Sequence, residues 1–535
     1  MHAHGSETYF IIGEGELSVS GDGRPDPRRV SADSAGTASR SSSRLAAAPP
    51  FRFSRLGPRG RALSEQNNIK IAKAMISERG GATGIPAGYT YLGQFVDHDL
   101  TFDKTEVMLG ESVTPAELLQ GRSPSLDLDS LYGAGPLDPK SAKFYADDFH
   151  LMMGRTVASG PDAARDGFDL PRGAGSSVAS KRRAVIPDPR NDENLAVAQT
   201  HLAMIRFHNR VVDKLPASVP DTARFDRARR RVVKHYQWMI RHDYLPRICK
   251  ASVLNDVFTN GRKVFEVDAA ASDVPTMPVE FSVAAFRLGH SMIRSSYSWN
   301  RRFTDGGGSL DLLFLFSATG GDLGGDVRLP SNWICDFRRL YPFADAARPD
   351  LAAPDGQSNL AMRLDTLLVD PLRNLPTGSF GGPAVPFNDP RANLAFRNLA
   401  RAAMVKLATG QQMVDLLASR GVGVTPLTRE QILEGRNGAR LDSLTSVEKD
   451  ALATRTPLWF YILREAELNR GKLDGVGARI VAETCHRAME GSTASIVRDA
   501  DFRPKLGPDS STFRMVDLLL FAFEGRKRLL NPLGP

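Results

Sequence analysis

The segment GQFVDHDLTFD, residues 93–103, places one imidazole between two carboxylates in an otherwise apolar stretch. Neighbouring side chains on a helix diverge by about 100° per residue, so Asp97, His98 and Asp99 cannot converge on one point. Each of the three should therefore serve a different target. Gln94 precedes His98 by about one helical turn and should lie on the same face of the helix. The segment predicts a base and two carboxylates that act in separate directions.

Oxygen-bearing side chains alternate in SPSLDLDSLYG, residues 123–133. Alternate side chains of an extended chain share a face, so these oxygens can converge on one hard cation such as Ca²⁺. The segment is not an EF-hand, because Tyr132 stands where that loop requires glycine. An acidic turn capped by serine hydroxyls explains the same residues equally well. The candidate ligands are Ser123, Ser125, Asp127 and Asp129.

Two further segments each carry a basic group. In DPRNDE, Arg190 and Glu193 would share a helical face, for which a surface ion pair is the simplest interpretation. In FRLGHSMIR, His290 stands among apolar residues with Arg287 just before it, and a lone core histidine is usually only hydrogen-bonded.

Considered together, these groups indicate more than each does alone. A haem peroxidase needs one axial imidazole for iron, a base for hydrogen peroxide and a fixed positive charge beside it. His98, Arg190 and His290 would supply these, and Asp97 and Glu193 would be spare carboxylates.

The same segments resemble the animal-type haem peroxidases, the peroxidase–cyclooxygenase superfamily, in their order and spacing. GQFVDHDLTFD, DLDSLYG and DPRNDENLAVAQTHLAMIRFHN are followed by HDYLPRI, AFRLGH and RNLAR. The resemblance runs from about residue 57 to 530 and is greatest for the bacterial, peroxicin-like branch. It implies an enzyme that uses hydrogen peroxide to oxidise iodide, bromide, thiocyanate or phenols via a ferryl–porphyrin radical.

The resemblance implies a role for each residue around the expected haem b. His98 is similar to the distal acid–base histidine, Arg190 to the distal arginine, and Gln94 to the residue that holds water or halide over the iron. Asp97 and Glu193 resemble the carboxylates that form esters with the haem.

On the other side, His290 resembles the proximal iron ligand, and Asn398 the asparagine that accepts a hydrogen bond from that imidazole. Arg287 and Arg401 resemble arginines near the propionates and the proximal side. The calcium ligands that the resemblance implies are Asp99, Ser123, Ser125 (through its carbonyl), Asp127 and Asp129.

The sequence departs from the family pattern at two positions. Asn194 follows Glu193 where chloride-oxidising members carry a methionine that forms a third covalent link, so chloride should be a poor substrate. Arg287 stands where cyclooxygenases and fatty-acid dioxygenases carry a radical-forming tyrosine. Fatty-acid dioxygenation is therefore the alternative function rather than the first.

The composition is that of an ordinary globular protein with a basic balance. The 535 residues are 41% hydrophobic and 24% charged, with a net charge of +8. The densest basic stretch, residues 227–242, has helical spacing, so a solvated helix face explains it better than nucleic-acid binding, the third hypothesis. Three scattered cysteines exclude a disulfide framework and a CxxC metal motif. We expect a monomer without a transmembrane segment or secretory signal, cytoplasmic or exported by a non-classical route.

Helical periodicity dominates the chain and must position these groups. It predicts a mainly α fold with few short strands, in which a flexible leader (1–56) precedes a single large domain (57–535). Predicted helices cover residues 63–78, capped by Ser64, and 142–153, 193–215, 221–248, 281–294, 391–419, 458–468 and 475–490.

Overall fold

The computed structural model describes residues 53–77, 81–102, 123–159, 167–376 and 385–534. It also describes the backbone of three N-terminal strands, β1 (Thr8–Ile11), β2 (Gly15–Val19) and β3 (Pro25–Val30). Apart from these strands, most of the predicted flexible leader lies outside the described residues. The predicted domain boundary between residues 56 and 57 stays a prediction.

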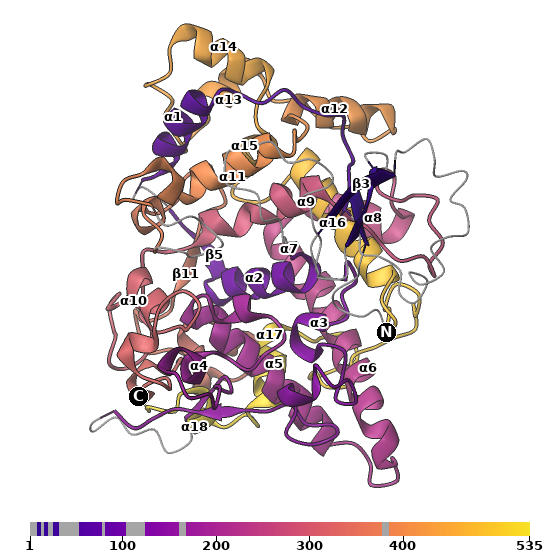
Figure 1. Ribbon diagram of the computed structural model, residues 1–535, viewed down its shortest axis with the longest axis vertical. Coiled ribbons are helices and arrows are strands. Elements are labelled where there is room, and N and C mark those ends of the chain that lie inside the picture. The colour runs from indigo at the N-terminus through magenta and orange to yellow at the C-terminus, as the bar shows by residue number, and fades with distance from the viewer. Residues whose placement is uncertain are drawn as a thin grey trace.

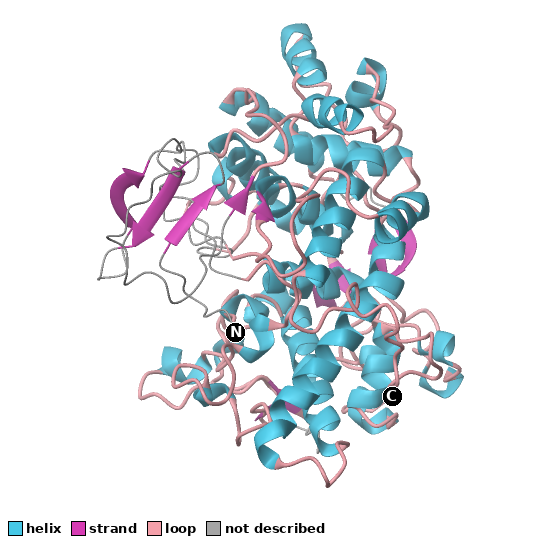
Figure 2. Ribbon diagram, turned by 90° about the vertical axis from the view of Figure 1, so that its right-hand side faces the viewer, coloured by secondary structure: helices cyan, strands magenta, loops and turns pink. Residues whose placement is uncertain are grey.

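Helices are the main regular structure of the described chain, as the mainly α prediction expects (Figure 2). In the first half they are α1 (Glu65–Met75), α2 (Gly88–Leu100), α3 (Asp129–Tyr132), α4 (Val178–Arg182), α5 (Leu195–Asp213), α6 (Asp221–Met239), α7 (Leu245–Ile248) and α8 (Ala251–Asn260). In the second half they are α9 (Val279–Val283), α10 (Leu310–Leu315), α11 (Leu394–Met404), α12 (Gly410–Ser419), α13 (Arg429–Glu434), α14 (Ser446–Thr454), α15 (Leu458–Leu468), α16 (Gly475–Glu490), α17 (Met515–Ala522) and α18 (Lys527–Leu530). Two 3₁₀ helices and one π-helix matter for the site: η5 (Pro189–Asp192), η7 (Ala285–Met292) and η6 (Ile240–Tyr244).

The strands are short. The largest sheet lies to one side of the helical body, and other strands lie among the helices (Figure 2). A five-stranded sheet has the order β3-β2-β1-β4-β8, in which β4 (Phe53–Ser54) and β8 (Met277–Pro278) run parallel. Three two-stranded sheets pair β5 (Ala82–Pro86) with β11 (Leu360–Met362), β6 (Gly154–Arg155) with β7 (Phe168–Asp169), and β9 (Ser296–Tyr297) with β10 (Gly308–Ser309).

Most of the predicted helices are confirmed, and three need correction. The region predicted at 391–419 is divided into α11 and α12, with residues 405–409 between them. The helices predicted at 458–468 and 475–490 match α15 and α16, and Ser64 caps α1 as expected. The helix predicted at 142–153 is wrong. Only residues 142–144 are helical, because the Asp147 carboxylate accepts the amides of Phe149 and His150 and closes a turn.

The third correction concerns the segment that carries the candidate proximal histidine. The helix predicted at 281–294 is divided into α9 and η7 at Ala284, whose backbone (φ −129°, ψ −69°) leaves the helical region. His290 therefore lies on a tightly wound 3₁₀ helix rather than on a regular α-helix.

Helix α2 lies near the centre of the molecule (Figure 1) and packs against α5 and η7. All of its residues except Gln94 are buried. Gly93 is required for this packing, because a Cβ atom there would lie 2.2 Å from the hydroxyl oxygen of Tyr244. No helix in the described part of the chain is long and apolar enough to cross a membrane.

Candidate active site

A cavity of about 290 Å³ lies where α2, η5, η7 and α11 meet. Its wall combines aromatic and aliphatic side chains with imidazoles, carboxylates and guanidinium groups. The structure thus brings together every predicted site residue except those assigned to calcium. The predicted residues that line the cavity are Gln94, Asp97, His98, Arg190, Glu193, Arg287, His290, Asn398 and Arg401.

His98 is a buried base with one ring nitrogen held and the other near the cavity wall. Its Nδ1 lies 2.8 Å from Oδ1 of Asn191, and its Nε2 lies 3.9 Å from a carboxylate oxygen of Glu193. Burial, together with the charge of Arg190, lowers the pKa of His98 to about 3. The imidazole is therefore neutral near pH 7 and able to accept a proton.

Arg190 is held by a carboxylate that the sequence analysis did not single out. Asp188 accepts hydrogen bonds from Nε and Nη2 of Arg190 at 3.1 and 2.7 Å. Nη2 also donates to the carbonyl oxygens of His98 (3.0 Å) and Thr101 (2.5 Å) at the end of α2. Burial opposes the charge of Arg190, but Asp188 outweighs this and leaves the pKa of Arg190 raised. A permanent cation is thus fixed beside the base.

The two candidate ester-forming carboxylates are buried in different surroundings. Asp97 receives a hydrogen bond from the Thr101 hydroxyl (3.2 Å), and its other oxygen lies 3.9 Å from Nη1 of Arg287. Burial raises the pKa of Glu193 to about 8, although Arg190 acts in the opposite direction. Asp97, His98 and Asp99 do act in different directions, as the helical spacing predicts.

Gln94 is fixed by Asn194, the residue that follows Glu193. The side-chain nitrogen of Asn194 donates to Oε1 of Gln94 at 3.0 Å. The oxygen of the same amide accepts from the backbone N–H of Val197 at 2.9 Å and so caps α5. Asn194 therefore joins the start of α5 to the distal helix.

Nδ1 of His290 faces the side chain of Asn398, but the nearest atom is the amide nitrogen and not the oxygen that the resemblance implies as acceptor. The side-chain nitrogen of Asn398 lies 2.9 Å from Nδ1 of His290. The two orientations of a carboxamide have the same shape, and the one with its oxygen toward Nδ1 leaves the lone pair of Nε2 for a metal. Burial and the charges of Arg287 and Arg401 lower the pKa of His290 to about 3, so the ring is neutral as a ligand must be.

Three residues of this site were not singled out by the sequence analysis. Asn191 and Asp188 lie within the DPRNDE motif but act on His98 and Arg190 only once η5 has packed on α2. Arg397 lines the cavity one helical turn before Arg401, and burial lowers its pKa to about 10. A helical projection of RNLAR could have found Arg397, because the two arginines share a face.

The predicted calcium ligands lie outside the cavity, beyond the far side of α2. Asp99 is fully buried and accepts hydrogen bonds from the amides of Leu128 and Ser130 and from the Ser130 hydroxyl. Asp129 receives a hydrogen bond from Arg229 at 3.3 Å. Burial and the neighbouring Asp129 raise the pKa of Asp127 to about 6. These contacts fasten the 123–130 loop to the distal helix.

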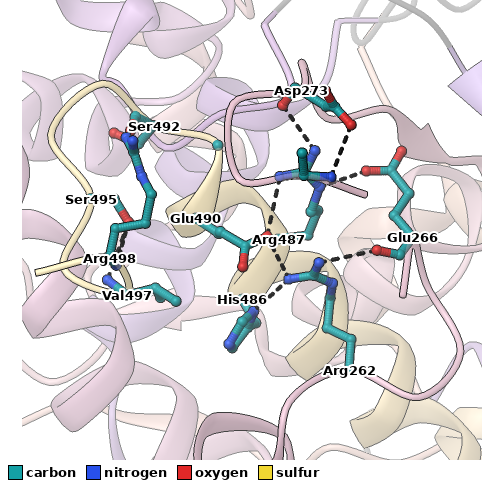
Figure 3. Close-up of polar contacts among 12 residues, drawn as sticks. Arg262, Glu266, Asp273, His486, Arg487, Glu490, Ser492, Ser495, Val497 and Arg498 are labelled. Atoms are coloured by element: carbon teal, nitrogen blue, oxygen red, sulfur yellow. Dashed lines mark hydrogen bonds and ion pairs between the residues drawn. The ribbon is translucent and has the colours of Figure 1, made fainter. Parts of the chain in front are cut away.

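A second segment covers this loop from the other side. Ser492 donates a hydrogen bond to Asp127, and Arg498 donates to the carbonyl oxygen of Ser492. Figure 3 shows how the end of α16 anchors this segment: Arg487 donates to Glu266 at 2.7 Å, and Glu490 pairs with Arg262 at 2.8 Å.

Not every buried oxygen atom of this region has a hydrogen-bond partner in the described part of the chain. The Ser123 hydroxyl is buried and has no hydrogen-bond partner among the described residues. Within the same residues, no group of three or more histidine, cysteine, aspartate or glutamate side chains is arranged to hold a metal ion. A calcium ion would therefore depend on serine and carbonyl oxygens as well as on carboxylates.

Comparison with known proteins relates the segment that carries most of this cavity to one family. Residues 94–315 match the family model described as animal haem peroxidase. Heme peroxidase 2 of Caenorhabditis elegans is 25% identical over 197 residues, which cover 35% of this chain and 26% of that protein. The match thus spans about a quarter of the relative's length.

Solved structures share the fold over nearly the whole chain. Peroxidase A from Dictyostelium discoideum aligns with a TM-score of 0.54 and 16% identity, covering 91% of this chain and 94% of that one. A fatty acid alpha-dioxygenase from Arabidopsis thaliana aligns with a TM-score of 0.51 and 12% identity, covering 84% and 72%. At these identities the likeness shows the fold alone: this chain has the mainly α fold of the haem peroxidases.

Proposed function

We propose that the chain is a haem peroxidase that reduces hydrogen peroxide and oxidises small anions or phenols. The observation that carries the proposal is that His98 and His290, widely separated in sequence, line one cavity together with Arg190, Asp97 and Glu193. The family match over residues 94–315 supports it. Within that family the short Asp188–Glu193 segment favours the bacterial, peroxicin-like branch.

The lining of the cavity suits haem b in its chemistry. Phe286, Phe314 and Leu394 give it apolar walls, and Arg287, Arg397 and Arg401 provide positive charge for two propionates. His290 would hold the iron through Nε2, while Asp97 and Glu193 would form the esters. Bound haem would supply the redox-active iron, which reduces peroxide and then takes electrons from the donors.

His98 and Arg190 supply the proton transfer and the charge that peroxide reduction needs. Nε2 of His98 accepts the proton from one peroxide oxygen and returns it to the other as that oxygen leaves as water. Arg190 faces the negative charge that develops on the leaving oxygen, and Asp188 keeps its guanidinium in place. Gln94, fixed by Asn194, would hold water or a halide beside His98.

We also propose a Ca²⁺ ion between Asp99 and the 123–130 loop. The buried, unpartnered Ser123 hydroxyl supports it, since a hydroxyl oxygen is a ligand that Ca²⁺ accepts. The carboxylates of Asp99, Asp127 and Asp129 do not converge on one point in the structure, so they would have to draw together around the ion. Ser123 and the carbonyl of Ser125 would complete its oxygen ligands.

Fatty-acid dioxygenation is the second candidate, favoured by the fold shared with the Arabidopsis enzyme. Against it, Arg287 occupies the position at which the resemblance implies a radical-forming tyrosine. Oxygen uptake with an unsaturated fatty acid and only a trace of peroxide would support the dioxygenase.

Reconstitution with haem b tests the proposal. We expect a Soret band, colour that stays with the protein through acid–acetone extraction, and peroxide-dependent oxidation of iodide and phenols. His98→Ala should retain haem and slow the reaction with peroxide by about 10²–10⁴-fold, because general acid–base catalysis is lost.

His150→Ala is the matched control, since His150 pairs with Asp147 and Asp213 away from the cavity. Wild-type protein that binds no haem, or a His98→Ala variant that reacts with peroxide at the wild-type rate, would refute the assignment.

A further inference from the structure

We propose that Asn191 is a positioning residue that fixes the tautomer of His98, holding its proton on Nδ1 so that Nε2 is the basic nitrogen. The effect on catalysis rests on the proposed function. The tautomer itself is a property of the haem-free chain, so it can be tested separately.

The contact between the two side chains is short and excludes solvent. Oδ1 of Asn191 lies 2.8 Å from Nδ1 of His98, and the two residues are 0% and 4% exposed. In the orientation that places Oδ1 of Asn191 next to Nδ1, this oxygen can only accept a hydrogen bond, so Nδ1 carries the proton. A neutral imidazole has a single N–H, which leaves the lone pair on Nε2, the nitrogen nearer to Glu193.

The single 3₁₀ turn η5 carries both of the residues that hold His98. Asp188 caps η5 by accepting the amide N–H of Arg190 at 3.0 Å. Arg190 then fixes the backbone at the end of α2 through the carbonyl oxygen of His98, while the next residue, Asn191, reaches the ring. Two adjacent residues of η5 thus orient His98: Arg190 holds its backbone and Asn191 holds its ring.

The uncharged partner matters because charged groups surround the imidazole. The charged groups that influence His98 are Asp188 and Arg190, from the segment before α5, and Arg287, from η7. Glu193 also faces the ring at 3.9 Å, but burial raises its pKa to about 8. Burial and the two arginines favour the neutral ring, whereas Asp188 and, to a smaller extent, the hydrogen bond with Asn191 favour the protonated one. A carboxylate at position 191 would add to Asp188 and favour imidazolium, which cannot accept a proton.

The opposite orientation of the amide makes the opposite prediction. Nδ2 of Asn191 is buried and has no hydrogen-bond partner among the described residues. If the amide were turned over, Nδ2 would donate to Nδ1, and the proton of the ring would move to Nε2. The basic nitrogen would then be Nδ1, which faces away from the cavity. The two arrangements can therefore be distinguished by experiment.

Nitrogen NMR of the haem-free protein with ¹⁵N-labelled histidine reads the tautomer directly, with His98→Gln to assign the signals. We expect a neutral His98 with the proton on Nδ1 near pH 7. A proton on Nε2, or an even mixture of tautomers, in the wild-type protein would overturn the proposal. Haem-free wild type with the expected tautomer whose reconstituted form ignores peroxide would refute the proposed function and leave this inference standing.

Two variants separate a positioning role from simple packing. Asn191→Leu fills similar space without an acceptor, so the proton of His98 should no longer be held on Nδ1. The reaction with peroxide should then slow by about 10²-fold at every pH. Asn191→Asp retains the acceptor, so it should keep the Nδ1 proton and move the acidic limb of the pH–rate profile to higher pH.

Asn255→Leu, on the exposed face of α8, is the matched control and should change neither signal nor rate. An Asn191→Leu protein with the wild-type tautomer contradicts the proposal. If that variant does not fold, the Asn191→Asp protein provides the test, and a proton on Nε2 of its His98 contradicts the proposal instead.

Discussion

At the residue scale, the charges of the cavity are paired differently from what adjacency in sequence suggests. Arg190 and Glu193 look like an ion pair in the sequence, yet Arg190 pairs with Asp188. Glu193 is left buried with a pKa raised to about 8. Near pH 7 it is therefore a neutral carboxylic acid, the less costly state for a buried group without a dedicated cation.

The haem-free protein should show this in the pH dependence of its stability. The pKa of Glu193 rises from 4.5 when unfolded to about 8 when folded, so between these values the folded state holds the extra proton. Its contribution to the free energy of unfolding therefore falls as pH rises, by at most about 1.4 kcal/mol per pH unit. Glu193→Gln should gain stability relative to wild type on going from pH 5 to pH 8, measured by urea denaturation.

Glu434→Gln, on the exposed surface of α13, provides the control and should follow wild type at both pH values. A constant difference between wild type and Glu193→Gln across this range would show that Glu193 ionises normally in the fold.

At the scale of elements, the junction between η5 and α5 positions most of the distal groups. Asp188 begins η5, Asn194 begins α5, and the residues between them reach α2. The capping amide of Asn194 has two separable tasks, since its oxygen serves α5 and its nitrogen serves Gln94. The junction thus joins helix capping to the organisation of the cavity.

Substitutions at Asn194 should separate these tasks. Asn194→Ala removes both contacts and should lower the free energy of unfolding by about 1 kcal/mol through the lost cap. Asn194→Asp keeps the acceptor for Val197 N–H at a helix N-terminus, so it should remain close to wild type. Urea denaturation measures the free energy of unfolding of both haem-free variants. An equal decrease in Asn194→Ala and Asn194→Asp would mean that Asn194 does not stabilise the fold by capping α5.

At the scale of the whole molecule, parts of the chain that are far apart in sequence meet around α2. The 123–130 loop binds Asp99 on one side and is covered by Ser492, from the segment after α16, on the other. Figure 3 shows that this segment is itself fixed by buried arginine–carboxylate pairs. A cation bound in this region would therefore join three distant segments at the back of the distal helix.

Calcium should stabilise this arrangement measurably. After chelation, added Ca²⁺ should raise the melting temperature, with about 2.7 kcal/mol gained at a hundredfold excess over Kd. Asp127→Asn should largely remove the gain, whereas Asp148→Asn, an exposed aspartate, should retain it. Thermal unfolding monitored by circular dichroism is sufficient, and an unchanged melting temperature in wild type would exclude the ion.

Much of the fold could be predicted because helix signals are local. The apolar periodicity of residues 458–468 and the Ser64 cap depend only on neighbouring residues, and both predictions are confirmed. The helix predicted at 142–153 failed because the Asp147 carboxylate competes for backbone amides. The helix predicted at 281–294 failed because the apolar pattern there is that of one continuous helix, whereas the backbone is kinked at Ala284.

The sequence by itself determined which chemical groups are present and, through helical spacing, that Asp97, His98 and Asp99 diverge. Spacing along a chain cannot state which atoms meet across it. Only the tertiary structure decided that Asp188 holds Arg190, that Asn191 holds His98, and that His290 lines the same cavity. The physical reason is that burial and long-range packing set the partners and the pKa of each group, and both arise only when the helices close around α2.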